Sequence, residues 1–303
     1  MQANIAFAAL IVGFVIGLTG MGGGALMTPV LVIFFGVTPS AAISSDVIAS
    51  VILKPIGGGV HARRGTVNWR LVRWLAVGSV PAAFAGSYAI SRITGGGAEN
   101  DIKQILGWVL LVAAAGMLTK TIVQTRRRAL PSGELLSPAL VRPLPTALIG
   151  VIGGFAVGLT SVGSGSLMIV MLMFLYPTLS AREMVGTDLV QAIPLVASAA
   201  IGHLIFGNLQ FGLTSSVLVG AIPGVYIGAR ISATATDRYI RPALIAVLTI
   251  SALKLVGASN NALLAATVVS IVIIAATFAI TARRRRRRLR PEPEPAPSVP
   301  LSS

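Results

Sequence analysis

Long apolar segments follow one another along the chain, and they restrict its fold more than any other feature. Seven of them are about 18–23 residues long, the length of a helix that crosses a ~30 Å hydrocarbon core. They cover residues 41–60, 70–91, 102–124, 183–203, 211–231, 240–257 and 262–282. Only 11% of the 303 residues are charged, whereas soluble domains carry about 25%. The sequence predicts an all-α polytopic membrane protein.

Four further apolar segments are shorter and form two pairs. The first pair covers residues 4–19 and 25–36, and the second covers residues 145–160 and 165–176. Glycine-rich breaks interrupt the pairs, as Gly20-Met21-Gly22-Gly23-Gly24 and as Ser161-Val162-Gly163-Ser164-Gly165. Segments of about 12–16 residues are short for a crossing. Each pair is either two short crossings or a hairpin of half-helices that meet near the middle of the membrane, and the segment length favours the hairpin.

The two halves of the chain are copies of each other. The pattern Gly13-Phe14-x-x-Gly17-Leu18-Thr19 returns 141 residues later as Gly154-Phe155-x-x-Gly158-Leu159-Thr160. After one inserted residue the offset becomes 142, and it pairs Asp46 with Asp188, His61 with His203, Gly78 with Gly220 and Gly86 with Gly228. Matches at a nearly constant spacing indicate an internal duplication.

Basic residues orient the two copies in the membrane. Arg63, Arg64, Arg70 and Arg73 surround the turn that follows segment 41–60, whereas the matching turn after segment 183–203 contains no Lys or Arg. Because Lys and Arg favour the cytoplasmic side, the copies should face opposite ways. The sequence therefore predicts inverted-topology repeats, with the C-terminus cytoplasmic and the N-terminus external.

The chain divides into five predicted parts. The repeats cover residues 1–124 and 145–257, each with a broken hairpin followed by about three transmembrane helices. A basic cytoplasmic loop at 125–144 joins them, and an extra transmembrane helix follows at 258–282. The tail at 283–303 is Arg-rich and then rich in Pro and Glu. This composition is typical of disorder, and its basic part favours anionic lipid rather than nucleic acid.

The glycine breaks are the predicted substrate site. Unpaired backbone groups at membrane depth need protein or a water-filled cavity, and helix starts near Gly24 and Gly165 would present N–H groups and the positive end of a dipole to an anion. The substrate-binding residues predicted here are Gly20, Met21, Gly22, Gly23, Gly24, Ser161, Gly163, Ser164 and Gly165. The alternative is that these glycines only permit close helix packing.

Polar residues inside the apolar segments extend this site. Lys54 either binds the anion or extends toward the nearby interface. Ser45, Thr187 and Gln191 are further polar contacts for a substrate. Asp46 and Asp188 are candidate coupling groups for a proton or a cation, unless they only stabilise helix N-termini.

The remaining polar motifs have structural interpretations. Ser180 and Glu183 predict a capping box at a helix start. His61 and His203 end equivalent helices, where interfacial placement and a gating or proton-sensing role both stay open. The chain has no Cys, and no constellation supports catalysis, a cofactor or a metal centre.

Two stretches of the sequence, one in each half, resemble a known protein family. The stretch Gly17-Leu18-Thr19-Gly20-Met21-Gly22-Gly23-Gly24-x-Leu26-x-x-Pro29, followed by Gly36-x-x-Pro39-x-x-Ala42-x-x-Ser45, resembles the opening signature of the TauE/SafE sulfite exporter family. Residues 158–167 look like the second copy, with Ser164 in place of Gly23 and Val170 in place of Pro29. The resemblance covers about residues 4–280. It implies a permease of the bacterial inner membrane for sulfite, sulfonates or related sulfur oxyanions, coupled to an ion gradient.

Together these observations predict a secondary transporter of a small anion that works by alternating access between the repeats. An ion channel built on the same re-entrant hairpins is the alternative. The expected partners are the anionic substrate and a coupling ion, either a proton or sodium. A homodimer stays open.

Overall fold

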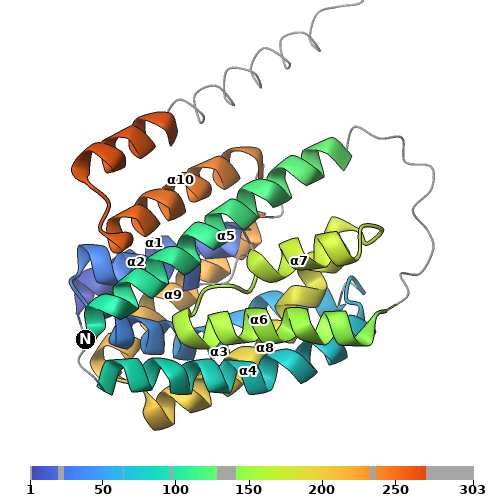
Figure 1. Ribbon diagram of the computed structural model, residues 1–303, viewed down its shortest axis with the longest axis horizontal. Helices are drawn as coiled ribbons and strands as arrows, with labels where there is room; N and C mark the ends of the chain where they lie inside the picture. Colours follow the sequence, from blue (N-terminus) through green and yellow to red (C-terminus); the bar gives the residue numbers. More distant parts are fainter. Residues whose placement is uncertain are drawn as a thin grey trace, which may run out of the picture.

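The computed structural model describes residues 2–19, 24–63, 65–95, 98–127, 141–232 and 237–270. These residues are helical with connecting turns and contain no strand, in agreement with the predicted all-α class (Figure 1). The helices are α1 (Ala3–Thr19), α2 (Gly24–Phe34), α3 (Pro39–Arg63), α4 (Trp69–Gly95), α5 (Glu99–Arg127), α6 (Pro143–Thr160), α7 (Leu167–Leu175), α8 (Ala181–Phe206), α9 (Phe211–Ser232) and α10 (Asp237–Val256). A further helical segment covers residues 260–270.

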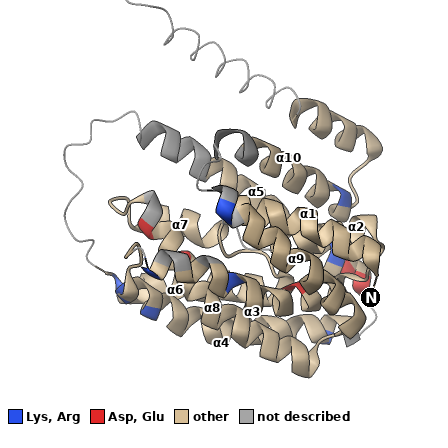
Figure 2. Ribbon diagram, turned by 180° about the vertical axis from the view of Figure 1, so that it is seen from behind, with Lys and Arg blue, Asp and Glu red and all other residues tan. Residues whose placement is uncertain are grey.

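Within the described residues, five helices are long and apolar enough to cross a membrane. The qualifying segments are Pro39–Ile56, Glu99–Thr119, Pro143–Thr160, Glu183–Phe206 and Phe211–Gly228. Charged residues are sparse along the helical body, which is mostly tan in Figure 2. Residues 271–282 of the predicted extra helix and the predicted tail at 283–303 lie outside the described residues.

The two interrupted pairs correspond to α1 with α2 and to α6 with α7. One member differs from the prediction, because α6 has 18 residues and is long enough to span the bilayer. Pro143 lies in its first turn, where the missing N–H of proline costs nothing. The helices also extend into both ends of the predicted loop at 125–144, because α5 ends at Arg127 and α6 begins at Pro143. This pair joins a full-length helix to the nine-residue α7, rather than two half-helices.

Glycines bring helices of opposite halves into backbone contact. A Cβ atom on Gly78 of α4 would lie 2.0 Å from the carbonyl oxygen of Ala147 in α6, and one on Gly220 of α9 would lie 1.9 Å from that of Ala6 in α1. Neither site accommodates a side chain. Because small residues let helices approach closely in membranes, α4 packs tightly on α6 and α1 on α9.

Helix α3 runs antiparallel to α8. Near its start, the Oγ atom of Ser44 lies 3.0 Å from Nδ1 of His203, close to the end of α8. Near its end, a Cβ atom on Gly58 would lie 3.0 Å from Cδ1 of Ile193, in the first half of α8. The equivalent long helices of the two halves therefore pack side by side in opposite directions.

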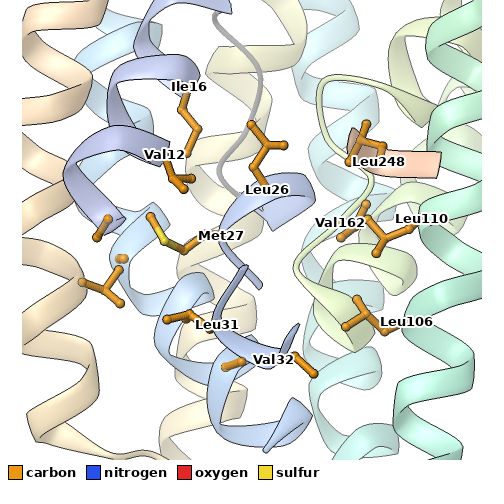
Figure 3. Packing of buried hydrophobic residues seen from close by; sticks show 14 of the residues in the cluster. Val12, Ile16, Leu26, Met27, Leu31, Val32, Leu106, Leu110, Val162 and Leu248 are labelled. Carbon is orange, nitrogen blue, oxygen red and sulfur yellow. The ribbon is translucent and has the colours of Figure 1, made fainter. Parts of the chain in front are cut away.

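The buried apolar side chains form two clusters, and both α3 and α5 contribute to each. One cluster also gathers residues of α1, α2, α9 and α10, and the other also gathers residues of α4, α6, α7 and α8. Val162, between α6 and α7, belongs to the first cluster and lies near Leu110 and Leu248 in Figure 3. The Val162 side chain therefore anchors the second break, which lies between α6 and α7, against side chains of the first cluster.

Candidate functional site

The second break is a buried, irregular turn between α6 and α7. Ser161 adopts the left-handed conformation with φ 61°, and Gly163 and Gly165 have φ 137° and φ 88°. L-residues rarely adopt such values, which explains the glycines at 163 and 165. Residues 161–166 are all buried. The predicted break is therefore present, enclosed by other helices.

Three backbone amides at this break are available to a ligand. The N–H groups of Leu167 and Met168, at the start of α7, already donate to the carbonyl oxygen of Gly163 at 3.1 and 3.3 Å. The amides of Ser164, Gly165 and Ser166 make no hydrogen bond to any residue in the described part of the chain. Successive free amides in a turn form a concave site that suits an anion.

The Ser166 hydroxyl adds a donor to these amides. Its side chain is buried, and its Oγ atom has no hydrogen-bond partner among the described residues. An unsatisfied buried hydroxyl is costly, so it points to a ligand or an ordered water at this place. The sequence analysis missed Ser166, although its position directly after Gly165 was a usable signal.

Lys54 reaches this break from α3. The side chain is only 7% exposed, and its Nζ atom donates to the Oγ atom of Ser164. Lys54 also interacts electrostatically with Asp188 and Asp46. Its ammonium group therefore points into the helical body, as the anion-binding hypothesis requires, rather than to the interface.

Asp46 of α3 contacts Ser161, the first residue of the same break. It is fully buried, and its Oδ2 atom accepts hydrogen bonds from Oγ1 of Thr28 at 3.1 Å and from Oγ of Ser161 at 2.7 Å. Its Oδ1 atom has no hydrogen-bond partner in the described residues. Thr28 is a second residue that sequence reasoning missed, although it lies one turn beyond Gly24.

The helix-start interpretation of the two aspartates fails. The first turn of α3 contains no acidic residue, and the acidic residue in the first turn of α8 is Glu183. Asp46 and Asp188 lie farther along their helices, where the stabilising effect of the dipole has faded. Both are buried, so they need another explanation.

The start of α2 lies directly against the second break. A Cβ atom on Gly24 would lie 1.7 Å from the carbonyl oxygen of Ser161 and 2.8 Å from its Oγ atom. The structure thus brings together one residue from each predicted break. Gly20, Met21, Gly22 and Gly23 lie outside the described residues.

The three predicted polar contacts are buried and bonded to protein groups. Ser45 accepts a hydrogen bond from Oγ1 of Thr214 at 3.0 Å, and Thr187 accepts one from the backbone N–H of Asn68 at 3.0 Å. Gln191 accepts a bond from Ser79 Oγ at 3.1 Å and donates through Nε2 to Sδ of Met168 at 2.7 Å. These side chains join helices in this structure.

His203 is buried among the helices. Its Nε2 atom lies 2.9 Å from the carbonyl oxygen of Gly158, and its Nδ1 atom lies 3.0 Å from Oγ of Ser44. Because a carbonyl only accepts, the hydrogen-bond network assigns a proton to Nε2. The ring joins α8 to α6 and α3. The side chain of the matching His61 lies outside the described residues.

The predicted capping box at the start of α8 is confirmed. The Ser180 hydroxyl accepts from the backbone N–H of Glu183 at 3.2 Å, and the Glu183 carboxylate accepts from the Ser180 N–H at 3.1 Å. This motif satisfies two N–H groups at a helix start and has a structural role.

Comparisons with known proteins agree with this architecture. The family model "Sulfite exporter TauE/SafE" matches residues 5–255. The probable membrane transporter protein YjnA of Bacillus subtilis (strain 168) is 37% identical over 261 residues, which cover 84% of this chain and 100% of the relative. YdhB of the same organism, also a probable membrane transporter protein, is 23% identical over 73% of this chain and 86% of its own length.

A probable membrane transporter protein of Xylella fastidiosa (strain Temecula1 / ATCC 700964) is 28% identical over 72% of this chain and 80% of its own length. No solved structure matches the chain. The family match spans nearly all of the described helices, five of which are long and apolar enough to cross a membrane. The chain is thus a multi-pass membrane transporter that belongs to the TauE/SafE sulfite exporter family.

Proposed function

We propose that this protein is a secondary transporter that moves a small anion, namely sulfite, an organosulfonate or another sulfur oxyanion, by alternating access. One observation carries the proposal. The Lys54 ammonium, the unpartnered Ser166 hydroxyl and the free amides of residues 164–166 converge on one buried turn. All of these groups donate hydrogen bonds.

This set of groups suits the chemistry of a sulfur oxyanion. Such a group presents only acceptor oxygens, and it needs several donors with one positive charge nearby. A buried Lys near the turn supplies the charge, and the amides supply directional donors at no side-chain entropy cost. Gly24 against Ser161 supports a contribution from the first break as well.

The packing supports inverted repeats. The contact of Gly78 with Ala147 has a counterpart in the contact of Gly220 with Ala6. The two glycines are 142 residues apart and the two alanines are 141 apart, which are the offsets of the duplication. The equivalent helices α3 and α8 run antiparallel. Two copies that face opposite ways give such a pattern. With the distribution of Arg residues, this favours a cytoplasmic C-terminus and an external N-terminus.

The same packing identifies the bodies that would move. Backbone contacts through glycine lock α1 to α9 and α6 to α4, and each pair joins the two halves of the sequence. Such contacts cannot slide without steric clash. We therefore assign α1 with α9 to one rigid body and α4 with α6 to the other, with motion at the interface of α3 and α8 between them.

Charge balance favours a coupling ion. The centre of the molecule holds two buried carboxylates, Asp46 and Asp188, and one ammonium, Lys54. A further negative charge about 8 Å from a carboxylate costs about 2 kcal/mol at an effective dielectric constant of about 20. A proton or cation that enters with the anion would remove this cost. Replacing both aspartates with Asn should then uncouple flux from the ion gradient, and retained coupling would reject their role.

Flux in proteoliposomes tests the proposal. We expect sulfite, thiosulfate, taurine or sulfoacetate to enter with saturation, and internal substrate to accelerate uptake of labelled substrate by counterflow. Single-channel currents without counterflow would support the channel alternative. The proposal fails if none of these anions moves while the reconstituted protein is intact in the membrane.

A further inference from the structure

We propose that Asp46, Thr28 and Ser161 form a sodium-binding site at the junction of α2, α3 and the second break. The site deepens the transport function above, because it names the coupling ion. Its capacity to bind Na⁺ does not depend on which anion is transported, so the two proposals can fail separately.

The first argument is the unsatisfied carboxylate oxygen. Asp46 is fully buried, and Thr28 and Ser161 both donate to Oδ2, which leaves Oδ1 without a hydrogen-bond partner in the described residues. A buried acceptor of this kind calls for an explanation, and a bound cation supplies one.

The second argument is that Na⁺ and a proton would use Oδ1 in different ways. A proton on Oδ1 would create a hydroxyl, which is a donor and needs an acceptor of its own. A cation instead uses the free lone pairs of Oδ1 directly, while Oδ2 keeps both of its hydrogen bonds.

The neighbouring oxygens are the third argument. The hydroxyls of Thr28 and Ser161 donate their hydrogens to Asp46, which leaves their oxygen lone pairs available to a cation. The carbonyl oxygen of Ser161 faces Gly24 at the same junction. It follows the C-terminus of α6, the negative end of that helix dipole. Hard cations prefer such oxygens, and transporters use interrupted helix ends of this kind to hold Na⁺.

The charge of the site favours a monovalent ion. One carboxylate balances one positive charge, and the other oxygens are neutral. In the described part of the chain no three His, Cys, Asp or Glu side chains gather in a way that would hold a metal ion. Divalent ions in proteins draw on more carboxylates than this junction offers.

The position of the site explains how the ion would act. The turn from Ser161 to Ser166 would hold the cation at its first residue and the anion at its last three, beside Lys54. Na⁺ would neutralise Asp46 and so remove a repulsion that opposes anion binding. By linkage, each ion would raise the affinity for the other by the same factor, roughly 5–150-fold.

Equilibrium binding of ²²Na⁺ to the purified full-length protein, with K⁺ as background salt and no sulfur oxyanion, tests the site. We expect saturable binding that Asp46→Asn abolishes. Thr28→Val should weaken it roughly tenfold or more, as loss of a supporting group does at metal sites, and Thr28→Ser should restore it. Thr249→Val is the matched control, because this α10 hydroxyl bonds only to its own helix, at the carbonyl of Ile245.

Three results would overturn the sodium site. These are wild-type protein that binds no Na⁺, an Asp46→Asn variant that binds it normally, and sulfite flux that is the same when choline replaces Na⁺. If flux is the same in choline, the proposed transport of the anion still stands and only the sodium site is rejected. If Na⁺ binds as expected but no sulfur oxyanion moves, the sodium site is supported and the proposed substrate is wrong. Size-exclusion profiles of every variant confirm that a loss of binding is not a loss of folding.

Discussion

Gly78 in the first half and Gly220 in the second occupy equivalent positions and make equivalent contacts. Each meets the carbonyl oxygen of an alanine in the opposite half, at distances that exclude a Cβ atom. Ser45 and Thr187 are equivalent too, and each hydroxyl bonds to the chain near the start of a helix from the other half, α9 or α4. Positions that the duplication preserved therefore hold the helices together.

Several polar groups of the candidate site follow the opposite rule. The residues equivalent to Lys54, Thr28 and Gln191 are Val196, Ile169 and Ala49, which are apolar. Asp46 is an exception, because its equivalent is Asp188. The duplicated frame is thus two-fold in its packing, whereas Lys54, Thr28 and Gln191 have no polar counterpart in the other half.

The largest expected effect follows from the matched glycines. Replacing either Gly78 or Gly220 with Leu should abolish folded protein, because the new side chain would enter backbone atoms of α6 or α1. Detergent size-exclusion chromatography would show loss of the monodisperse peak for both. Gly212→Ala is the control, since a Cβ atom there meets nothing within 4 Å. If only one of the two positions tolerates Leu, Gly78 and Gly220 do not make equivalent contacts.

The unmatched Lys54 gives the next largest effect. Loss of a charged hydrogen bond in a buried site costs about 2–3 kcal/mol, so Lys54→Gln should raise the KM of sulfur oxyanion flux roughly 30–150-fold. Val196→Ala, at the equivalent position, should change stability and leave KM unaltered. An unchanged KM in Lys54→Gln, measured in proteoliposomes with equal protein content, would remove Lys54 from the site.

Ser166 should give a smaller change. Its hydroxyl has no partner in the described residues, so Ser166→Ala removes one neutral hydrogen bond to the anion and no bond within the protein. The expected rise in KM is roughly fivefold, from about 1 kcal/mol. Thermal stability should stay the same or increase. A fall in stability with an unaltered KM would show that the hydroxyl serves the fold.

Much of this fold was predictable because apolar runs and glycine breaks are local signals. Six of the seven long segments, the helices on either side of the two breaks and the capping box at Ser180 appear where the sequence places them. The contact of Lys54 with Ser164 was not predictable, because it joins residues 110 positions apart. Asp46 with Ser161, separated by 115 positions, is a similar case. No local pattern encodes how α3 docks on the second break.

The surroundings of some polar side chains could not be predicted from their position along a helix. His203 lies near the end of its helix, yet α3 and α6 enclose its ring. Asp46 and Asp188 lie beyond the first turns of their helices, and both are buried. Position along a helix predicts exposure only when the neighbouring helices are known.

The smallest expected effects concern Ser45 and Thr187, which the sequence analysis proposed as substrate contacts. In the structure Thr187 accepts the N–H of Asn68, and a Val there would leave this partly buried donor unpaired. Ser45→Ala is milder, because Thr214 can donate to the carbonyl of Gln210 instead, at 3.1 Å. We expect losses of about 1–2 kcal/mol for Thr187→Val and under about 1 kcal/mol for Ser45→Ala. Thr187→Ser should keep the bond.

Thermal unfolding and flux together decide between the two roles of these hydroxyls. If these hydroxyls form interhelical bonds, Thr187→Val should lower the melting temperature more than Ser45→Ala does. Both variants should then keep the wild-type KM. A raised KM without a change in melting temperature would instead make them substrate contacts. It would also remove the contrast between the matched Ser45 and Thr187, assigned to packing, and the unmatched Lys54, assigned to binding, because a matched pair would then contribute to binding from both halves.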